Sequence, residues 1–210
     1  MRRVVLLGDS IFDNAAYVAG GPDVIKQVQA CLPAGWEGIL RAVDGHVTTD
    51  VPQQLAGLPA HSYLIVSAGG NDALGYIDIL NQRAQSTAEV LHMLADIHDQ
   101  FHANYQQMLS AVLHQECPTA LCTIYYPRFP DPGLQRLAVT ALTIFNDCIL
   151  HQACAAGLPV LDLRLICNEA EDYADPVEPS EHGGAKIAAA IVSLLREHDF
   201  TRGRTEVFVK

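Results

Sequence analysis

A serine follows directly on the first apolar run of the chain. Residues 4–7 read Val-Val-Leu-Leu and lead at once into Gly8-Asp9-Ser10. A glycine allows the chain to turn sharply where a Cβ would clash, so Ser10 can present its hydroxyl and its backbone N–H at the end of a strand. Gly-Asp-Ser is a common tripeptide, and its serine could equally cap a helix. The turn predicts a nucleophile only if other segments support it.

Two later segments offer hydrogen-bond donors of the kind that acyl transfer needs. Residues 67–72 read Ser-Ala-Gly-Gly-Asn-Asp, in which Asn71 can donate from its amide while the two glycines permit close approach. Residues 44–48 read Asp-Gly-His-Val-Thr, and the backbone N–H of Gly45 can donate to the same developing oxyanion. A plain turn is the alternative interpretation of the Gly-Gly-Asn-Asp stretch.

Together these segments resemble the SGNH (GDSL) hydrolases, a family of esterases and lipases named for a Ser, a Gly, an Asn and a His in four sequence blocks. Ser10, Gly45 and Asn71 match the first three blocks in order. The resemblance implies a three-layer α/β/α fold with a flavodoxin-like parallel sheet of about five strands. It also implies a serine hydrolase that cleaves carboxylic esters, small acyl or O-acetyl esters among them, through an acyl-enzyme on Ser10. The N–H groups of Ser10 and Gly45 and the Asn71 amide would form the oxyanion hole.

The fourth block departs from the family pattern. The family has Asp-x-x-His near its C-terminus, followed a few residues later by a glycine that opens the last helix. If Gly184 is that glycine, the histidine position falls on Pro179 and the aspartate position on Pro176, and neither can do the chemistry. His182 could be the general base if the loop takes another route. Glu178 could hold that histidine or act on the serine directly.

The irregular fourth block leaves a second function open. A catalytically weak or inactive protein with the same fold could bind an acylated or carbohydrate ligand. A dinucleotide-binding protein ranks lower, because the first turn lacks Gly-x-Gly-x-x-Gly. His98 and His102 have a spacing that can bind zinc, but the Glu of His-Glu-x-x-His and a third ligand are missing, and no Cys-x-x-Cys occurs. We therefore expect neither a metal nor another cofactor.

Alternating strands and helices must place these groups together. Short apolar runs predict buried strands, and apolar residues at helical spacing predict helices between them. The alternation indicates a doubly wound parallel sheet, whose site lies at the carboxyl ends of the strands. The expected strands are residues 4–7, 39–43, 63–66, 120–125 and 159–162, and the expected helices include residues 24–31, 90–97, 134–154 and 187–195.

Length and composition indicate one globular domain. The chain has 210 residues, of which 50% are hydrophobic and 18% charged, so we expect a single domain over residues 1–200 and a tail over 201–210. Residues 207–209 of the tail could add an edge strand or contact a partner. The chain shows no lid-like apolar insertion, which favours small soluble esters over long-chain lipids.

Charge and hydropathy indicate which partners to expect. The net charge of −11 disfavours nucleic acid and anionic membranes. No window approaches the roughly 20 apolar residues that span a bilayer, and the first residues do not resemble a secretory signal. We expect a cytoplasmic protein that acts on a small-molecule ester, without a membrane or nucleic-acid partner. A homo-oligomer is possible.

Overall fold

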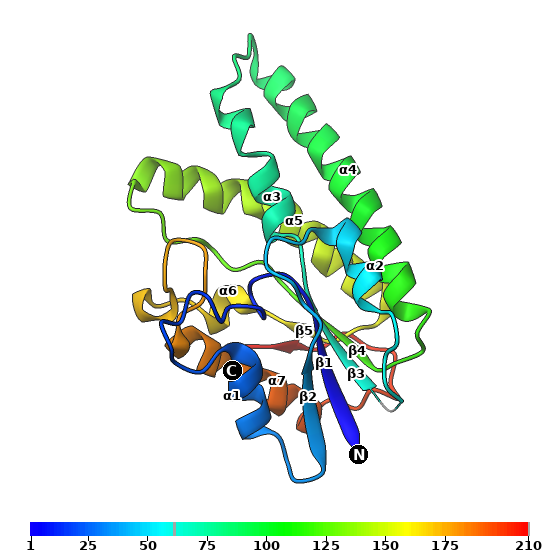
Figure 1. The fold of residues 1–210 in the computed structure, drawn as a ribbon. Coiled ribbons are helices and arrows are strands. Elements are labelled where there is room, and N and C mark those ends of the chain that lie inside the picture. Colours follow the sequence, from blue (N-terminus) through cyan, green and yellow to red (C-terminus); the bar gives the residue numbers. More distant parts are fainter. Residues whose placement is uncertain (61, 210) are drawn as a thin grey trace.

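The computed structural model describes residues 1–60 and 62–209 and is built around one parallel sheet with helices on both faces (Figure 1). The sheet has six strands in the order β2-β1-β3-β4-β5-β6, all parallel. This confirms the predicted α/β fold and adds one strand to the expected five. The strands are β1 (Arg2–Gly8), β2 (Trp36–Leu40), β3 (Ser62–Ser67), β4 (Thr119–Cys122), β5 (Val160–Leu161) and β6 (Val207–Phe208).

Four longer helices cover the sheet, two on each face. α1 (Val24–Cys31) and α7 (Glu181–Glu197) share one hydrophobic cluster with Val4 and Leu6 of β1. α4 (Thr87–Leu113) and α5 (Pro132–Ala156) share the other with Val5 and Leu7. Alternate residues of β1 thus enter opposite cores, which is why its run is continuously apolar. The shorter helices are α2 (Val51–Gln54), α3 (Gly70–Gly75), α6 (Leu163–Ile166), η1 (Thr48–Asp50), η2 (Ile77–Asn81) and η3 (Ala170–Asp172).

Capping side chains fix where the long helices begin. Asp23, Ser86, Asp131 and Ser180 each accept a hydrogen bond from a backbone N–H in the first turn of α1, α4, α5 and α7, respectively. Each cap satisfies a helix N–H that has no partner within its own helix. The cap at Ser180 matters most for the site, because it fixes the direction in which the preceding loop enters α7.

The second strand differs from its predicted position. β2 ends at Leu40, whereas residues 39–43 were expected. The N–H groups of Arg41 and Ala42 both donate to the carbonyl of Leu6 at 2.9 Å, so the chain bends across the end of β1 instead of continuing as a strand. This bend directs the loop containing Gly45 toward the carboxyl edge of the sheet.

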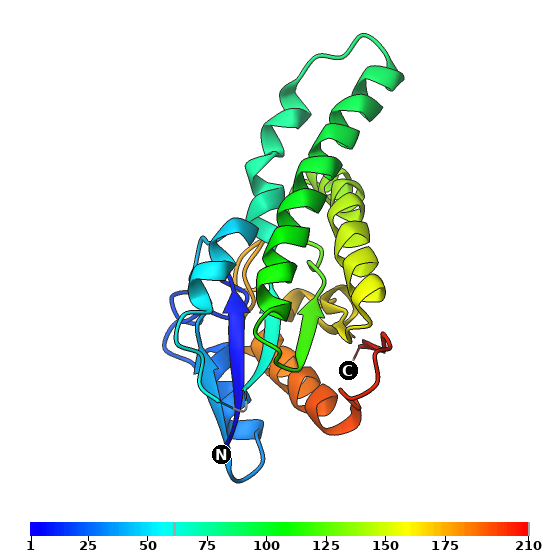
Figure 2. The same cartoon turned by 90° about the vertical axis from the view of Figure 1, so that its right-hand side faces the viewer.

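The first turns of α4 project beyond the body of the protein. Figures 1 and 2 show η2 and the start of α4 extending together away from the sheet. We call residues 77–97 the helical arm. Val90 and Leu91, at the start of the helix predicted over residues 90–97, are 40% and 61% exposed because the arm passes beyond the sheet that would cover them.

Helix α5 corrects the expectation that no segment could span a bilayer. By length and composition it is apolar enough to cross a membrane, and 33% of its most apolar window is buried. Within the fold its apolar residues have two separate uses. Cys148, Ile149 and Ala153 pack into the core beneath the sheet, whereas Leu137 and Leu142, nearer its start, line a pocket described below.

The C-terminal segment adds an edge strand. Of the two possibilities for residues 207–209, the structure shows Val207 and Phe208 paired with β5 as β6. Nearby, His198 Nδ1 lies 2.6 Å from Glu206 Oε2, which joins the end of α7 to this segment. Only the last residue, 210, lies outside the described part of the predicted tail.

We predict that Gly8→Ala is strongly destabilising. Gly8 has φ +130°, and a Cβ there would lie 1.7 Å from the Ser67 carbonyl oxygen of the neighbouring strand. Strain and overlap together should lower the free energy of unfolding by about 3 kcal/mol or more. Chemical denaturation measures this. Gly75→Ala is the control, since nothing lies within 4 Å of its added Cβ. Equal stability of the two variants would contradict the prediction.

Candidate active site

Ser10 lies in the turn that follows β1, at the carboxyl edge of the sheet. It is 5% exposed. Asp9 holds the turn: its N–H donates to the Ser67 carbonyl at 3.3 Å, and its Oδ1 accepts the N–H of Ile11 at 3.2 Å. The fixed turn leaves the Ser10 hydroxyl directed at one acceptor.

That acceptor is Glu178. Ser10 Oγ donates to Glu178 Oε1 at 2.9 Å, and both residues are largely buried. The second carboxylate oxygen, Oε2, is also buried and has no hydrogen-bond partner within residues 1–60 and 62–209. A buried carboxylate on a serine hydroxyl can take up the proton that the serine must lose to become a nucleophile.

The loop that carries Glu178 is tied to the first part of the chain. Asp175 Oδ1 accepts the backbone N–H of Glu178 at 2.9 Å. Asn14, which is fully buried, donates from Nδ2 to the Pro179 carbonyl at 3.1 Å and accepts the Val24 N–H at 2.9 Å. One side chain therefore links the start of α1 to the residue next to Glu178. The reach of Asn14 to residue 179 has no sequence signal.

The packing of α7 changes how the fourth block is read. A Cβ at Gly183 would lie 2.2 Å from the Asp172 carbonyl oxygen, whereas one at Gly184 would meet a glutamine side chain at 2.9 Å. Gly183 is thus the glycine that the helix opening requires. Counted from it, the expected histidine position falls on Glu178 and the aspartate position on Asp175. Counting from Gly183 instead of Gly184 moves both positions by one residue.

His182 faces a different part of the molecule. Its N–H lies in the first turn of α7, where Ser180 Oγ accepts it at 3.1 Å, and its side chain is 57% exposed. Its Nε2 lies 3.7 Å from Asp172 Oδ1, and it is not among the residues that line the pocket beside Ser10. The structure therefore brings Glu178 to the serine and leaves His182 outside.

Glu169, Asp172 and His182 form the one group of metal-ligand type found among the described residues, with ligand atoms within 4.8 Å of one another. The Nζ of Lys186 lies 2.7 Å from Glu169 Oε2 and 2.9 Å from Asp172 Oδ1. The Lys186 ammonium group therefore balances the negative charge of these two carboxylates. The contacts of Lys186 link α7 to η3.

Asn71 and Gly45 are held differently. Asn71 lines the same pocket as Ser10, and its Nδ2 donates to the His46 carbonyl at 3.0 Å. An amide NH₂ has two hydrogens, so one remains for a ligand. Gly45 has φ +81° and is exposed. Gly45 is not among the pocket-lining residues, and its link to the site is the neighbouring His46 carbonyl, which accepts the Asn71 hydrogen bond.

Two further residues support these loops. The side-chain amide of Gln54 bonds both backbone groups of Gly8, accepting its N–H and donating to its carbonyl at 2.8 Å each, and lies 3.0 Å from His46 Nδ1. Asp72 accepts the N–H and hydroxyl of Thr48 at 3.0 and 2.6 Å. Gln54 carries no sequence signal, since it lies in a short polar helix.

Burial gives both carboxyl groups near the serine unusual proton affinity. It raises the pKa of Glu178 to about 7, although the Ser10 hydrogen bond opposes this, and the negative charges of Asp175 and Asp44 add to it. Burial likewise raises the pKa of Asp9 to about 7, and the charge of Glu178 contributes. A base with a pKa near neutrality is suited to proton transfer in neutral solution.

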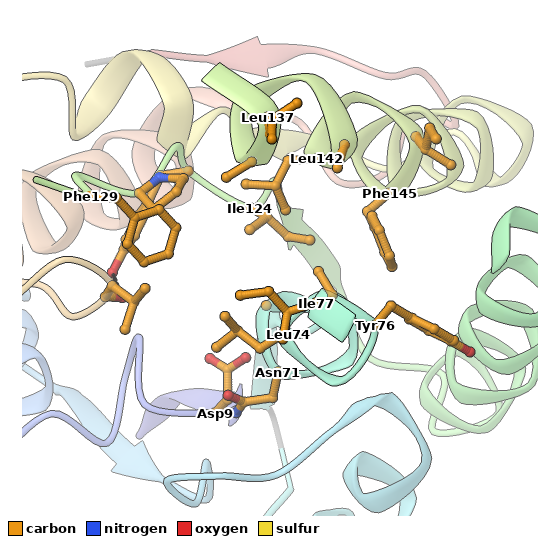
Figure 3. Close-up of a pocket in the computed structure, with 18 of the residues that line it drawn as sticks. Asp9, Asn71, Leu74, Tyr76, Ile77, Ile124, Phe129, Leu137, Leu142 and Phe145 are labelled. Atoms are coloured by element: carbon orange, nitrogen blue, oxygen red, sulfur yellow. Dashed lines mark hydrogen bonds between the residues drawn. The ribbon is translucent and has the colours of Figure 1, made fainter. Parts of the chain in front are cut away.

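The pocket beside Ser10 is predominantly apolar. It extends from Asp9, Ser10 and Asn71 between α3, η2 and the first half of α5 (Figure 3). Leu80, Leu94 and Ile97 of the helical arm also line it. These apolar residues come from two separate segments, the arm and α5, and they combine only in the folded chain, so the pocket has no single apolar insertion as its sequence signal.

Comparisons with known proteins agree with this fold. The model of the GDSL-like lipase/acylhydrolase family matches residues 6–186. No curated protein matches the chain. A lipase from a goat rumen metagenome has a similar structure, with 18% identity, 92% of this chain and 97% of that one covered, and a TM-score of 0.70. A lipase/acylhydrolase from Enterococcus faecalis has 20% identity, with 93% of this chain and 96% of that one covered and a TM-score of 0.65. A carbohydrate acetylesterase from Sinorhizobium meliloti has 15% identity, with 93% of this chain and 99% of that one covered and a TM-score of 0.62. The chain belongs to the GDSL-like lipase/acylhydrolase family.

Proposed function

We propose that the protein hydrolyses carboxylic esters through an acyl-enzyme on Ser10, with Glu178 as the general base. The observation that carries this proposal is the 2.9 Å hydrogen bond from the Ser10 hydroxyl to a buried carboxylate. Family membership supports ester hydrolysis in general, and the residues named here refine it.

The reaction takes two similar halves. Glu178 removes the Ser10 proton while Oγ attacks the ester carbonyl carbon, and the resulting oxyanion accepts hydrogen bonds from the Ser10 N–H and the Asn71 amide. The Gly45 N–H joins them if its loop closes on the substrate. Protonated Glu178 then gives its proton to the departing alcohol oxygen. Water, deprotonated by Glu178, attacks the acyl-enzyme, and the proton returns to Ser10 as the carboxylic acid leaves.

A glutamate base changes the charge balance of the site. A histidine base becomes a cation when it takes the serine proton, and an adjacent carboxylate stabilises that cation. Glu178 becomes neutral instead, so it needs no such partner. This fits the role of Asp175, whose carboxylate accepts the backbone N–H of Glu178 and so holds the loop.

A ligand-binding protein without turnover is the second candidate function. The observation in its favour is the glutamate at the position where the family has histidine. Such a protein would keep the pocket and its apolar walls for an acylated or carbohydrate ligand. Labelling of Ser10 separates the two functions.

We predict that a fluorophosphonate forms a covalent adduct on Ser10, because Glu178 activates that hydroxyl. Intact-protein and peptide mass spectrometry locate the adduct. Hydrolysis of 4-nitrophenyl butyrate should fall at least about 1000-fold in Ser10→Ala, since the acyl-enzyme cannot form. Ligand binding with neither adduct nor turnover would favour the second function.

We predict that kcat/KM rises with pH through about 7. The base acts in its ionised form, so activity is lost as the pH falls below the pKa of Glu178, which burial raises to about 7. Glu178→Gln should reduce the rate about 100- to 10,000-fold at all pH values, because an amide cannot take the proton. Stopped assays over pH 5 to 9 test this.

Two variants serve as controls for that experiment. Glu178→His should retain part of the activity, because imidazole has a pKa of about 6.5 and can replace the base. His182→Ala should keep the wild-type rate and profile. Glu178 would be excluded as the base if Glu178→Gln kept full activity, whether or not His182→Ala lost it.

A further inference from the structure

The polar and apolar parts of the pocket are separated. Its charged and amide side chains, and those of Ser10 and Ser67, gather at one end, where Asp9, Asn71 and Glu178 lie, and the other hydroxyls of the lining belong to two tyrosines, Tyr76 and Tyr125. Beyond them the lining consists of aliphatic and aromatic residues. A ligand that fits such a pocket has one polar reacting group and an apolar chain on one side of it.

Two facing walls form the apolar part. Figure 3 shows Leu74 and Ile77 on one side, Leu137 and Leu142 on the other, and Ile124 between them. Leu74, Ile77 and Leu137 are 40%, 43% and 52% exposed, although they line a pocket. Facing apolar side chains left open to water gain stability from an apolar ligand that covers them.

The charge of the pocket restricts the ligand further. No Lys or Arg is among the residues that line it in the described structure, and two carboxyl groups stand at its polar end. The whole chain carries a net charge of −11. An anionic group on the acyl chain would meet repulsion and no compensating cation.

Resting on the proposed function, we infer that the substrate is an ester with a medium or long uncharged acyl chain, which lies between α3–η2 and the first half of α5. The carbonyl carbon reaches Ser10 and the chain extends toward the helical arm. This inference replaces the preference for small acyl groups that the sequence suggested. It makes the pocket-lining side chains of the arm and of the start of α5, and not the arm as a whole, the ones that determine chain length.

The experiment compares 4-nitrophenyl acetate, butyrate, octanoate and decanoate. Each buried methylene should raise kcat/KM about threefold, so octanoate should exceed acetate by at least about 100-fold. An octanoate analogue with a terminal carboxylate, mono-4-nitrophenyl suberate, should react at least about tenfold more slowly than octanoate. Equal rates along the series, or no discrimination against the carboxylate, would overturn the inference.

Matched variants locate the chain. Ile77→Asn/Leu137→Asn should lower the octanoate-to-acetate ratio at least about tenfold. Leu91→Asn is the control, since Leu91 is 61% exposed on α4 and does not line the pocket. It should leave the ratio unchanged. An equal fall in both variants would contradict the placement, and the wild-type series tests chain length even if a variant fails to fold.

A binding measurement separates this inference from the proposed function. Calorimetry of 4-nitrophenyl octyl ether with Ser10→Ala needs no turnover, and binding that Ile77→Asn/Leu137→Asn weakens would support the apolar site. Ether binding without hydrolysis of any ester would overturn only the proposed function. Hydrolysis with acetate preferred, and no ether binding, would overturn only the inference about the chain.

Discussion

The hydrogen bond between Ser10 and Glu178 is the contact on which the site depends, and it joins residues 168 positions apart. Neither residue could hold the other without support, because fixing two distant segments costs conformational entropy. Gln54 donates a hydrogen bond to the carbonyl of Gly8, two residues before the serine, and Asn14 donates one to the carbonyl of Pro179, next to the glutamate. The sheet brings these segments to one edge, and the buried amides fix their final positions. The geometry of the candidate site and the packing of these segments therefore rest on the same few polar contacts.

Burial is what allows a carboxylate to occupy a position where the family has histidine. In water a glutamate has a pKa of about 4.3 and is a weak base at neutral pH. Inside this site the loss of hydration favours the protonated form and raises the pKa of Glu178 to about 7. The same environment raises the pKa of Asp9 to about 7, so the two groups resist being ionised together. Two buried carboxyl groups so close together destabilise the fold when both are charged.

Parts of this arrangement could be predicted from sequence because they follow local rules. The continuous apolar run of β1 and the glycine before Ser10 identify a buried strand and a sharp turn, and the Gly-Gly-Asn-Asp stretch identifies the loop that carries Asn71. The partner of Ser10 could not be located in this way. His182 and Glu178 both lie near the expected block, and the choice depends on whether Gly183 or Gly184 packs against Asp172, which is a contact made only in the folded chain. Gln54 and Asn14 act through backbone atoms of distant residues and leave no pattern in the sequence.

Helix α5 shows how one pattern can serve two purposes that sequence does not separate. Its apolar residues continue through the whole helix, yet those near its C-terminus are buried under the sheet while Leu137 remains 52% exposed beside the pocket. Core packing alone does not require apolar residues at exposed positions. The facing helices α3 and η2 also carry large apolar side chains at exposed positions, namely Leu74, Ile77 and Leu80. Because the two groups face each other across the pocket, a single apolar ligand would cover both walls, and this shared geometry is what supports the proposed acyl-chain site.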